Sequence, residues 1–403
     1  MSEFAHFARD EEQLTIAGRM VRRLIGQLDA GGLTVTLPRG SRLTLEGDRP
    51  GTHASIDVKR WRALARLLAG GDIGFASAYR CGDWDAADLT KLLTWALENE
   101  AALNNATRGN AVLRTLYRLR HDRRENSRFN SRRNISAHYD LGNAFYAKWL
   151  DGGMNYSSGI YSSPHDTLES AQARKIDRVC ELMDLNGGEK VLEIGCGWGA
   201  VAERLAVAHR CAVTALTLSH EQRAYASDRL QRAGRASGVD VRLQDYRDVE
   251  GRFERIVSIE MLEAVGEKYW PQYFAKLRNC LAPAGVAVVQ VITIAADRYD
   301  AYRTRPDFIQ LEIFPGGALP TGEIIEAQAA VAGLKITRRE LFGASYARTL
   351  AEWRRRFNSS WSQIAPLGFD EPFRRLWNYY LCYCEAGFSA EALDVGLYRI
   401  EHA

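Results

Sequence analysis

The sequence contains no hydrophobic run long enough to cross a membrane. Its longest apolar stretch, "GVAVVQVITIAA" at 285–296, has about half the length that a spanning helix needs and is interrupted by a glutamine. The amino terminus, "MSEFAHFARDEEQ", is acidic and lacks the continuous apolar core of a secretory signal. We therefore expect a cytoplasmic protein that contacts the inner face of a membrane only peripherally.

Paired cysteines and a large net charge are also lacking. The seven cysteines are odd in number, scattered, and without the spacing of a zinc site, which indicates reduced thiols and no metal centre. A net charge of +3 over 403 residues does not indicate a nucleic-acid partner. With 46% hydrophobic residues, the chain can bury the cores of about two or three globular domains.

Positive charge is nevertheless concentrated in one segment. Between 108 and 133 there are nine arginines against only Asp122 and Glu125. Apolar residues at 112, 113, 116, 117 and 119 lie among the basic ones, so the segment predicts an amphipathic helix with a cationic face. Such a helix would bind an anionic membrane surface, and a solvated linker helix is the alternative.

The order of sequence patterns predicts three parts. Residues 1–103 combine short alternating segments, "LTVTLP" and "RLTLEG", with helical patterns at 59–69 and 86–103, which indicates a small α+β domain. Residues 104–133 form the basic linker, and 134–403 form the catalytic domain. From 168 onward, helices alternate with short apolar strands, which predicts an α/β, Rossmann-like parallel sheet covered on both faces. The last third is mostly helical, with a closing strand near "LDVGLYRIEH".

A glycine-rich motif follows the first strand of this sheet. In "VLEIGCGWG", residues 191–199, Gly195, Gly197 and Gly199 stand where the backbone turns sharply and a ligand can approach closely. The spacing is neither the dinucleotide fingerprint nor a phosphate loop. It is typical of an S-adenosylmethionine-dependent methyltransferase, with a purely structural turn as the alternative. Glu193 and Asp245 occupy positions typical of cofactor contacts.

A carboxylate that commonly follows the second strand and holds the cofactor ribose is missing. Thr217, Ser219 and Gln222 stand there instead. These polar residues and the neighbouring sequence motifs resemble those of a known family. The motifs are, in chain order, "NISAHYDLGNAFYAKWL", "MNYSSGIY", "LESAQARKID", "VLEIGCGWG", "TLSHEQ", "LQDYRD", "EAVGEKYWPQYF", "IFPGGALP" and "FGASYARTLAEWRRRF".

From about 134 to 403, the chain resembles the cyclopropane fatty acid synthases and mycolic acid methyltransferases. The resemblance implies a Rossmann-like class I methyltransferase domain with helical additions that bind an acyl chain. It also implies a cofactor site for S-adenosylmethionine, comprising Tyr156, Ser157, Val191, Glu193, Gly195, Cys196, Gly197, Gly199, Thr217, Leu218, Ser219, Gln222, Asp245 and Tyr246. Composition alone would make "NYSSGIY" (155–161) an exposed linker. The resemblance assigns Tyr156 and Ser157 to the cofactor wall instead.

The family's reaction transfers a methyl group to a cis double bond of a phospholipid acyl chain, after which a base removes a proton. In the family that base is a bound bicarbonate, and the resemblance assigns its ligands to Glu263, Tyr346, the backbone of Ile292, and the positions of Ser158 and Gln290. The last two depart from the family pattern of cysteine and histidine. Serine and glutamine can still hydrogen-bond an anion, so bicarbonate binding stays open. A glutamine, however, cannot become cationic.

Three further residues have two interpretations each. Glu260 is an additional carboxylate that could replace bicarbonate as the base, or a carboxylate at a helix start without catalytic role. Cys384 aligns with a cysteine discussed as an active-site residue, and we expect it to line the acyl tunnel. His138 is a catalytic candidate but more commonly such a residue is a cap or a core histidine.

The leading functional hypothesis is cyclopropane formation on unsaturated phospholipid acyl chains. The alternative is a fatty acid C-methyltransferase that yields a methyl-branched unsaturated chain, because the cysteine and histidine positions are changed. A noncatalytic lipid-binding protein that keeps the cofactor fold is the third hypothesis. The expected partners are phospholipid acyl chains and a membrane surface, without nucleic acid, and a homodimer stays open.

Overall fold

The computed structural model describes residues 25–107, 109–122 and 141–403, together with positions 19, 21, 22, 124, 126, 127 and 130. The chain divides into two compact units. The first comprises residues 1–117 and 369–390, and the second comprises 118–368 and 391–403. Within the described residues, no helix has the length and apolar character that crossing a bilayer requires.

The first unit is built on a four-stranded sheet of order β2-β1-β3-β4. Its strands are β1 (Ala30–Thr36), β2 (Arg42–Glu46), β3 (Arg49–Val58) and β4 (Trp84–Asp85). The hairpin expected from "LTVTLP" and "RLTLEG" is present as the antiparallel pair β1 and β2. The helices are α3 (Arg62–Arg80), α4 (Leu89–Glu98), α5 (Glu100–Thr107) and the start of α6 (Ala111–Asp122).

A helix from the C-terminal third also belongs to the first unit. Helix α17 (Glu371–Ser389) packs against α3 and α4, although it lies within the range 134–403 that the sequence assigns to one domain. Arg375 on α17 donates to the carbonyl oxygens of Tyr79 and Trp84, and its guanidinium lies 4.0 Å from the centre of the Tyr79 ring. Long-range contacts of this kind cannot be read from a local pattern.

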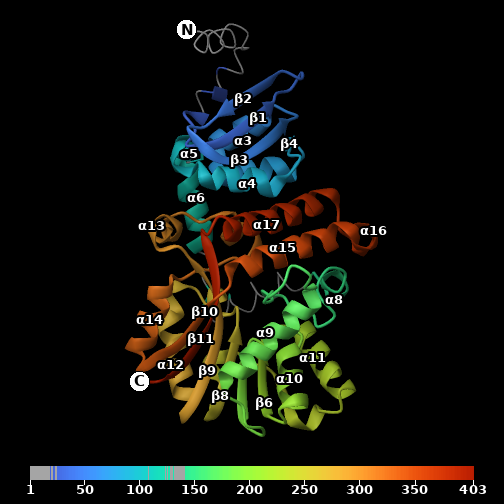
Figure 1. The fold of residues 1–403 in the computed structure, drawn as a ribbon, viewed down its shortest axis with the longest axis vertical. Helices are drawn as coiled ribbons and strands as arrows, with labels where there is room; N and C mark the ends of the chain where they lie inside the picture. Colours follow the sequence, from blue (N-terminus) through green and yellow to red (C-terminus); the bar gives the residue numbers. More distant parts are fainter. Residues whose placement is uncertain are drawn as a thin grey trace. The chain divides into compact units, whose positions relative to one another are not determined.

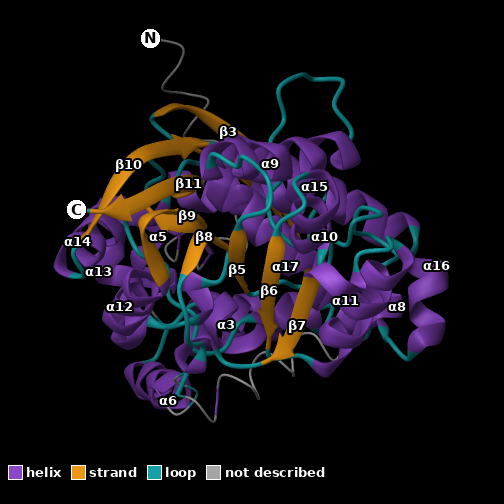
Figure 2. Ribbon diagram, turned by 90° about the horizontal axis from the view of Figure 1, so that it is seen from below, coloured by secondary structure: helices purple, strands orange, loops and turns teal. Residues whose placement is uncertain are grey.

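The second unit contains a seven-stranded sheet of order β10-β11-β9-β8-β5-β6-β7 (Figure 2). The strands are β5 (Lys190–Ile194), β6 (Ala212–Thr217), β7 (Val239–Leu243), β8 (Phe253–Ile259), β9 (Leu281–Ile294), β10 (Leu334–Leu341) and β11 (Leu393–His402). Strands β5 to β9 pair in parallel, as expected. Strand β11 pairs antiparallel with both β9 and β10, which the sequence pattern did not indicate.

Helices cover both faces of this sheet because its buried strands carry apolar residues on both sides. On β9, Val288 faces a core shared with α9 (Leu168–Met183) and α10 (Ala200–Ala208). Its neighbour Val289 faces the opposite core, shared with α12 (Trp270–Cys280) and α14 (Gly322–Val331). Figure 1 shows these two groups of helices on opposite sides of the sheet, with α11 (His220–Arg232) beside α10. The Rossmann-like fold expected from the sequence is confirmed.

The remaining helical segments of the second unit follow the parallel strands or precede them. They are α8 (Asn143–Tyr146), α13 (Ala296–Thr304), α15 (Gly343–Ser359), α16 (Trp361–Ile364), the π-helical turn Ile309–Ile313, and the 3₁₀ turns Ala236–Gly238, Tyr246–Asp248, Leu262–Ala264, Glu267–Tyr269 and Ala365–Leu367. Because the carboxyl ends of parallel strands share one edge of a sheet, the loops after β5, β8 and β9 meet there.

Candidate active site

The glycine motif forms a tight turn between β5 and α10. Gly195, Gly197 and Gly199 have φ values of 84°, 51° and 84°, a region that residues with a side chain rarely adopt. A Cβ atom at Gly199 would lie 3.0 Å from the Ala226 Cβ, so packing requires glycine there. A Cβ atom at Gly197 would meet no protein atom within 4 Å. The turn therefore leaves open space beside Gly197, which suits close approach of a cofactor.

Glu193, at the end of β5, provides a buried polar atom suited to a cofactor. Among the described residues, no group donates a hydrogen bond to its Oε2 atom. Burial raises the pKa of Glu193 to about 8, and the ammonium of Lys175 opposes this rise. The geometry of the glycine turn and this unpaired oxygen both fit S-adenosylmethionine.

The other predicted cofactor residues lie at the ends of β6 and β7. The hydroxyl of Thr217 donates to the side-chain oxygen of Gln222 at 2.9 Å, and Ser219 caps α11. Leu218 is half-buried between them. Asp245 accepts two hydrogen bonds from the guanidinium of Arg247, at 2.8 and 2.7 Å, and Tyr246 is buried. Cys196 is buried in the glycine turn, where burial raises its pKa well above the ordinary value, so the thiol is protonated.

Residues 155–161 are clamped in place by three separate elements. From α9, Gln172 donates to the carbonyl oxygen of Ser157, and Lys175 donates to its hydroxyl, both at 2.7 Å. From α15, the hydroxyl of Thr349 accepts from the backbone N–H of Gly159 at 3.2 Å. The backbone N–H of Ser158 donates to Glu260, which follows β8. A segment held on three sides in this way is not an exposed linker.

The carboxylate of Glu260 is the point on which the predicted base site converges. Its Oε1 accepts from the backbone N–H of Ser158 at 2.9 Å and from the side-chain amide of Gln290 at 2.7 Å. Its Oε2 accepts from the hydroxyl of Tyr346 at 2.6 Å. The structure thus brings three of the predicted bicarbonate ligands together, and a carboxylate of the chain lies between them.

Glu263 forms a separate contact three residues later. Its Oε1 accepts from the backbone N–H of Ile292, which is the backbone position predicted from the resemblance. In the described part of the chain, no group donates a hydrogen bond to its Oε2. Burial and the negative charge of Glu260 raise the pKa of Glu263 to about 8. Burial also raises the pKa of Glu260, whereas its three donors and Lys175 lower it, so Glu260 holds the charge more readily than Glu263.

Aromatic side chains form the wall beside this carboxylate. The Tyr156 ring lies 5.2 Å from that of Trp353 and 5.5 Å from that of Trp149, and Tyr346 contacts Trp353 edge-on at 6.1 Å. Aromatic faces attract positive charge. The wall thus combines an apolar surface with groups that favour a cation near Glu260.

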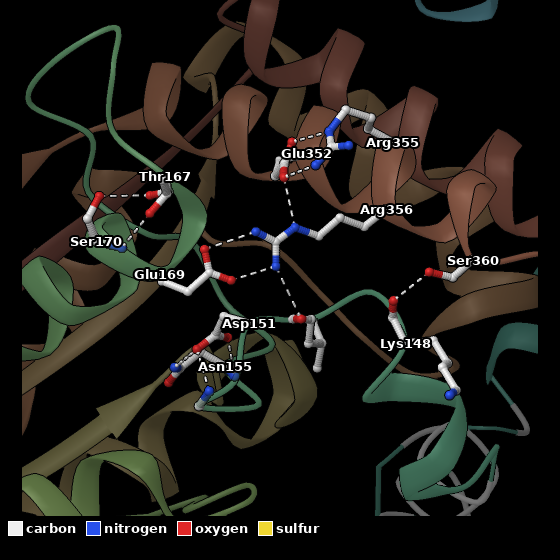
Figure 3. A network of polar contacts seen from close by, with 12 residues as sticks. Lys148, Asp151, Asn155, Thr167, Glu169, Ser170, Glu352, Arg355, Arg356 and Ser360 are labelled. Atoms are coloured by element: carbon white, nitrogen blue, oxygen red, sulfur yellow. Dashed lines mark hydrogen bonds and ion pairs between the residues drawn. The ribbon is translucent and has the colours of Figure 1, made fainter. Parts of the chain in front are cut away.

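A network around Arg356 fixes the helix that carries Tyr346 (Figure 3). Arg356 on α15 binds both carboxylate oxygens of Glu169 on α9, at 2.7 and 3.0 Å, and donates to Glu352 at 2.7 Å. It also reaches the carbonyl oxygen of Leu150, just before the segment 155–161. The arginine therefore holds together the three elements that position Tyr346, Lys175 and Ser157.

Some site residues escaped the sequence analysis. Lys175, 1% exposed, is the main example, and its signal is a lysine at an otherwise apolar helix position, between Leu168 and Val179. Gln172, Thr349 and Trp353 carry no pattern that distinguishes them from core residues. Cys384 lies on α17 in the first unit and so is not among the residues that the second unit brings together. His138 lies outside the described residues.

Comparisons with known proteins show the family of the chain. The model of the mycolic acid cyclopropane synthetase family matches residues 126–397. The chain belongs to this family. Among curated members, the tuberculostearic acid methyltransferase UfaA1 of Mycobacterium tuberculosis is 39% identical over 396 residues, covering 94% of this chain and 89% of that protein. The cyclopropane-fatty-acyl-phospholipid synthase of Escherichia coli is 34% identical over 366 residues, covering 89% of each.

Solved structures of the family are similar to two thirds of the chain. The cyclopropane synthase MmaA2 of Mycobacterium tuberculosis matches with 31% identity and a TM-score of 0.63, covering 67% of this chain and 97% of that one. The mycolic acid cyclopropane synthase CmaA1, solved with S-adenosylhomocysteine and CTAB, matches with 29% identity and the same TM-score and coverage. This member of the family is thus an S-adenosylmethionine-dependent methyltransferase, as the sequence predicted.

Proposed function

We propose that the protein methylates the cis double bond of an unsaturated phospholipid acyl chain and releases a methyl-branched unsaturated chain. The observation that carries this proposal is the Glu260 carboxylate held by Ser158, Gln290 and Tyr346. The base site therefore differs from the one that the resemblance implies for cyclopropane formation. The comparisons support this alternative better than the cyclopropane product that the sequence favoured, because a relative matched over 94% of the chain is named for methylation.

The chain's residues suit each stage of such a reaction. S-adenosylmethionine, when bound, supplies an electrophilic methyl group. The glycine turn, Glu193 and Ser157 would orient it, and the aromatic wall would exclude water and stabilise positive charge on the acyl carbon. Glu260 would then accept a proton from a neighbouring chain carbon. The electrons of that C–H bond form the new double bond, so the charge that arrived with the methyl group is neutralised.

Product analysis tests this function. Incubation with S-adenosylmethionine and vesicles of monounsaturated phospholipid is expected to add the mass of one CH₂ group to the acyl chains. Mild hydrogenation should then add two hydrogens to the product, because a branched alkene is reduced and a cyclopropane ring is not. Boiled enzyme is the control. A product of the same mass that resists hydrogenation would contradict the branched alkene, and no gain in mass would contradict methyl transfer itself.

We further propose that α6 docks on an anionic bilayer. Val112, Leu116 and Leu119 are 68%, 52% and 46% exposed and lie at the spacing of one helix face. Arg118 is exposed on the same helix, whereas Arg120 is paired with Glu312 at 3.1 Å, and a basic residue near an anionic membrane contributes about 1 kcal/mol. An apolar stripe beside basic side chains is the pattern of a helix that lies in the membrane interface.

Leu116→Glu is expected to weaken binding to anionic vesicles at least tenfold. Burying a leucine side chain contributes about 1.5–3 kcal/mol, and the new carboxylate would also be repelled. Ala111→Glu, at an exposed position of the same helix that lies off the stripe of Val112, Leu116 and Leu119, introduces the same charge and should weaken binding less. Sedimentation with vesicles at low and high salt measures both. Equal binding by the two variants would contradict docking through this face.

A further inference from the structure

The donor groups around the base site are already occupied by the chain's own carboxylates. Glu260 accepts hydrogen bonds from the N–H of Ser158, the amide of Gln290 and the hydroxyl of Tyr346. Glu263 accepts a hydrogen bond from the N–H of Ile292. These donors belong to residues that the resemblance assigns to bicarbonate, and the Ser158 hydroxyl donates to the carbonyl oxygen of Gly159 at 2.9 Å. The residues present therefore do not fit a bound bicarbonate ion.

We infer that the Glu260 carboxylate takes the place of bicarbonate as the base, so that this enzyme works without that ion. The inference rests on the proposed methyl transfer and concerns the group that accepts the proton.

The backbone of Glu260 supports a dedicated role. Its φ of 47° lies in the left-handed region, which is uncommon for a residue with a side chain and persists where the surrounding structure enforces it. Its N–H donates to the carbonyl oxygen of Gln290 at 2.8 Å, one residue beyond the last β8 pairing with β9. The unusual conformation therefore begins where the strand ends, and the side chain bonds to groups from three other segments.

The hydrogen-bond pattern also leaves Glu260 able to accept a proton. An ionised carboxylate has about four lone-pair positions, and the three donors leave one free, on Oε2. In the reaction, a C–H bond of the acyl cation breaks, its electron pair stays on the chain, and the proton binds Glu260. The proton passes to solvent after the product leaves. Tyr346 would fix the angle of the accepting oxygen.

The second carboxylate limits the charge of the site. With its pKa raised to about 8, Glu263 is largely protonated at neutral pH, whereas Glu260 has three donors and the nearby Lys175 to stabilise its negative charge. A bicarbonate ion added to this buried pair would bring a further negative charge, while the N–H groups of Ser158 and Ile292, the amide of Gln290 and the hydroxyl of Tyr346 already donate to Glu260 and Glu263. Burying such an unpaired charge is strongly unfavourable.

Glu260→Gly provides a direct test. Glycine adopts a positive φ readily and removes the occupant, which frees the three donors for an external anion. In buffer depleted of carbon dioxide, we expect the parent to turn over normally and the glycine variant to be about a hundredfold slower, as for loss of a general base. Added bicarbonate should leave the parent unchanged and restore at least tenfold activity to the variant. Glu260→Gln keeps the space filled without a base, so it should be slow and not rescued.

Binding of ¹³C-labelled bicarbonate, followed by NMR without acyl substrate, gives a readout independent of turnover. We expect binding by the glycine variant and none by the parent or the glutamine variant. Thermal unfolding checks that all three are folded. Bicarbonate binding by the parent, a parental rate that depends on bicarbonate, or an unimpaired glycine variant would each overturn the inference. Failure of the proposed function would appear differently, as the absence of the methylated product from the parent.

Discussion

Lys175→Met is expected to move the acid limb of the pH–rate profile to higher pH by about one unit, the usual size of a nearby opposite charge's effect. The ammonium of Lys175 lowers the pKa of Glu260, and catalysis as proposed needs Glu260 ionised. Without this cation, Glu260 binds its proton at a higher pH. On the acid limb, where Glu260 is mostly protonated, the variant should therefore be about tenfold slower than the parent, and the two rates should converge as the pH rises.

Ser157→Ala is the matched control for this prediction. It removes the hydroxyl that accepts from Lys175 at 2.7 Å and keeps the ammonium. Its main effect should be on the KM for S-adenosylmethionine. The acid limb of the profile of kcat against pH should stay at the same pH as in the parent. Burial lowers the pKa of Lys175 to about 8, so most parent molecules carry the charge at pH 6. An unshifted acid limb in Lys175→Met would show that the lysine does not act on the base.

Trp353→Ala is expected to lower the free energy of unfolding by about 3–5 kcal/mol, the usual cost of truncating a buried aromatic residue to alanine. The side chain is completely buried, and its ring contacts Trp149, Tyr156 and Tyr346. The cavity would loosen both Tyr156 and Tyr346, so the rate should fall together with stability. Denaturant unfolding and methyl transfer to vesicles measure the two effects.

Trp353→Phe distinguishes the effect of lost ring packing from the effect of a lost hydrogen bond. Among the described residues, no acceptor binds the indole N–H of Trp353, so phenylalanine removes volume without breaking a hydrogen bond. It should cost less than half as much as alanine. Equal destabilisation by both variants would contradict the view that the aromatic wall acts through ring packing.

The sequence predicted the parallel part of the fold because that part is local. Each strand from β5 to β9 is a short apolar run next to a helical pattern, and right-handed βα units then leave little freedom. The antiparallel position of β11 between β9 and β10 was not predicted, because strand order at a sheet edge depends on contacts between distant segments. The same limit applies to α17, which packs with helices almost three hundred residues earlier.

The sequence predicted which residues belong to the candidate site, but not how they are arranged in space. The resemblance named Ser158, Gln290 and Tyr346 as holders of an external ion, and Glu260 was left with two interpretations. Only the folded chain shows that these groups bind Glu260, because they come from a loop, a strand and a helix far apart in sequence. Lys175 was missed because a basic residue in an amphipathic helix is usually solvated, and only packing distinguishes this one.

The left-handed backbone at Glu260 has a consequence for how such enzymes diverge. A position of this kind accepts glycine without strain. A single codon change at residue 260 would therefore replace the built-in base, the Glu260 carboxylate, with bicarbonate from solution. An enzyme with the built-in base modifies its lipids at a rate that is uncoupled from the cell's carbon dioxide supply.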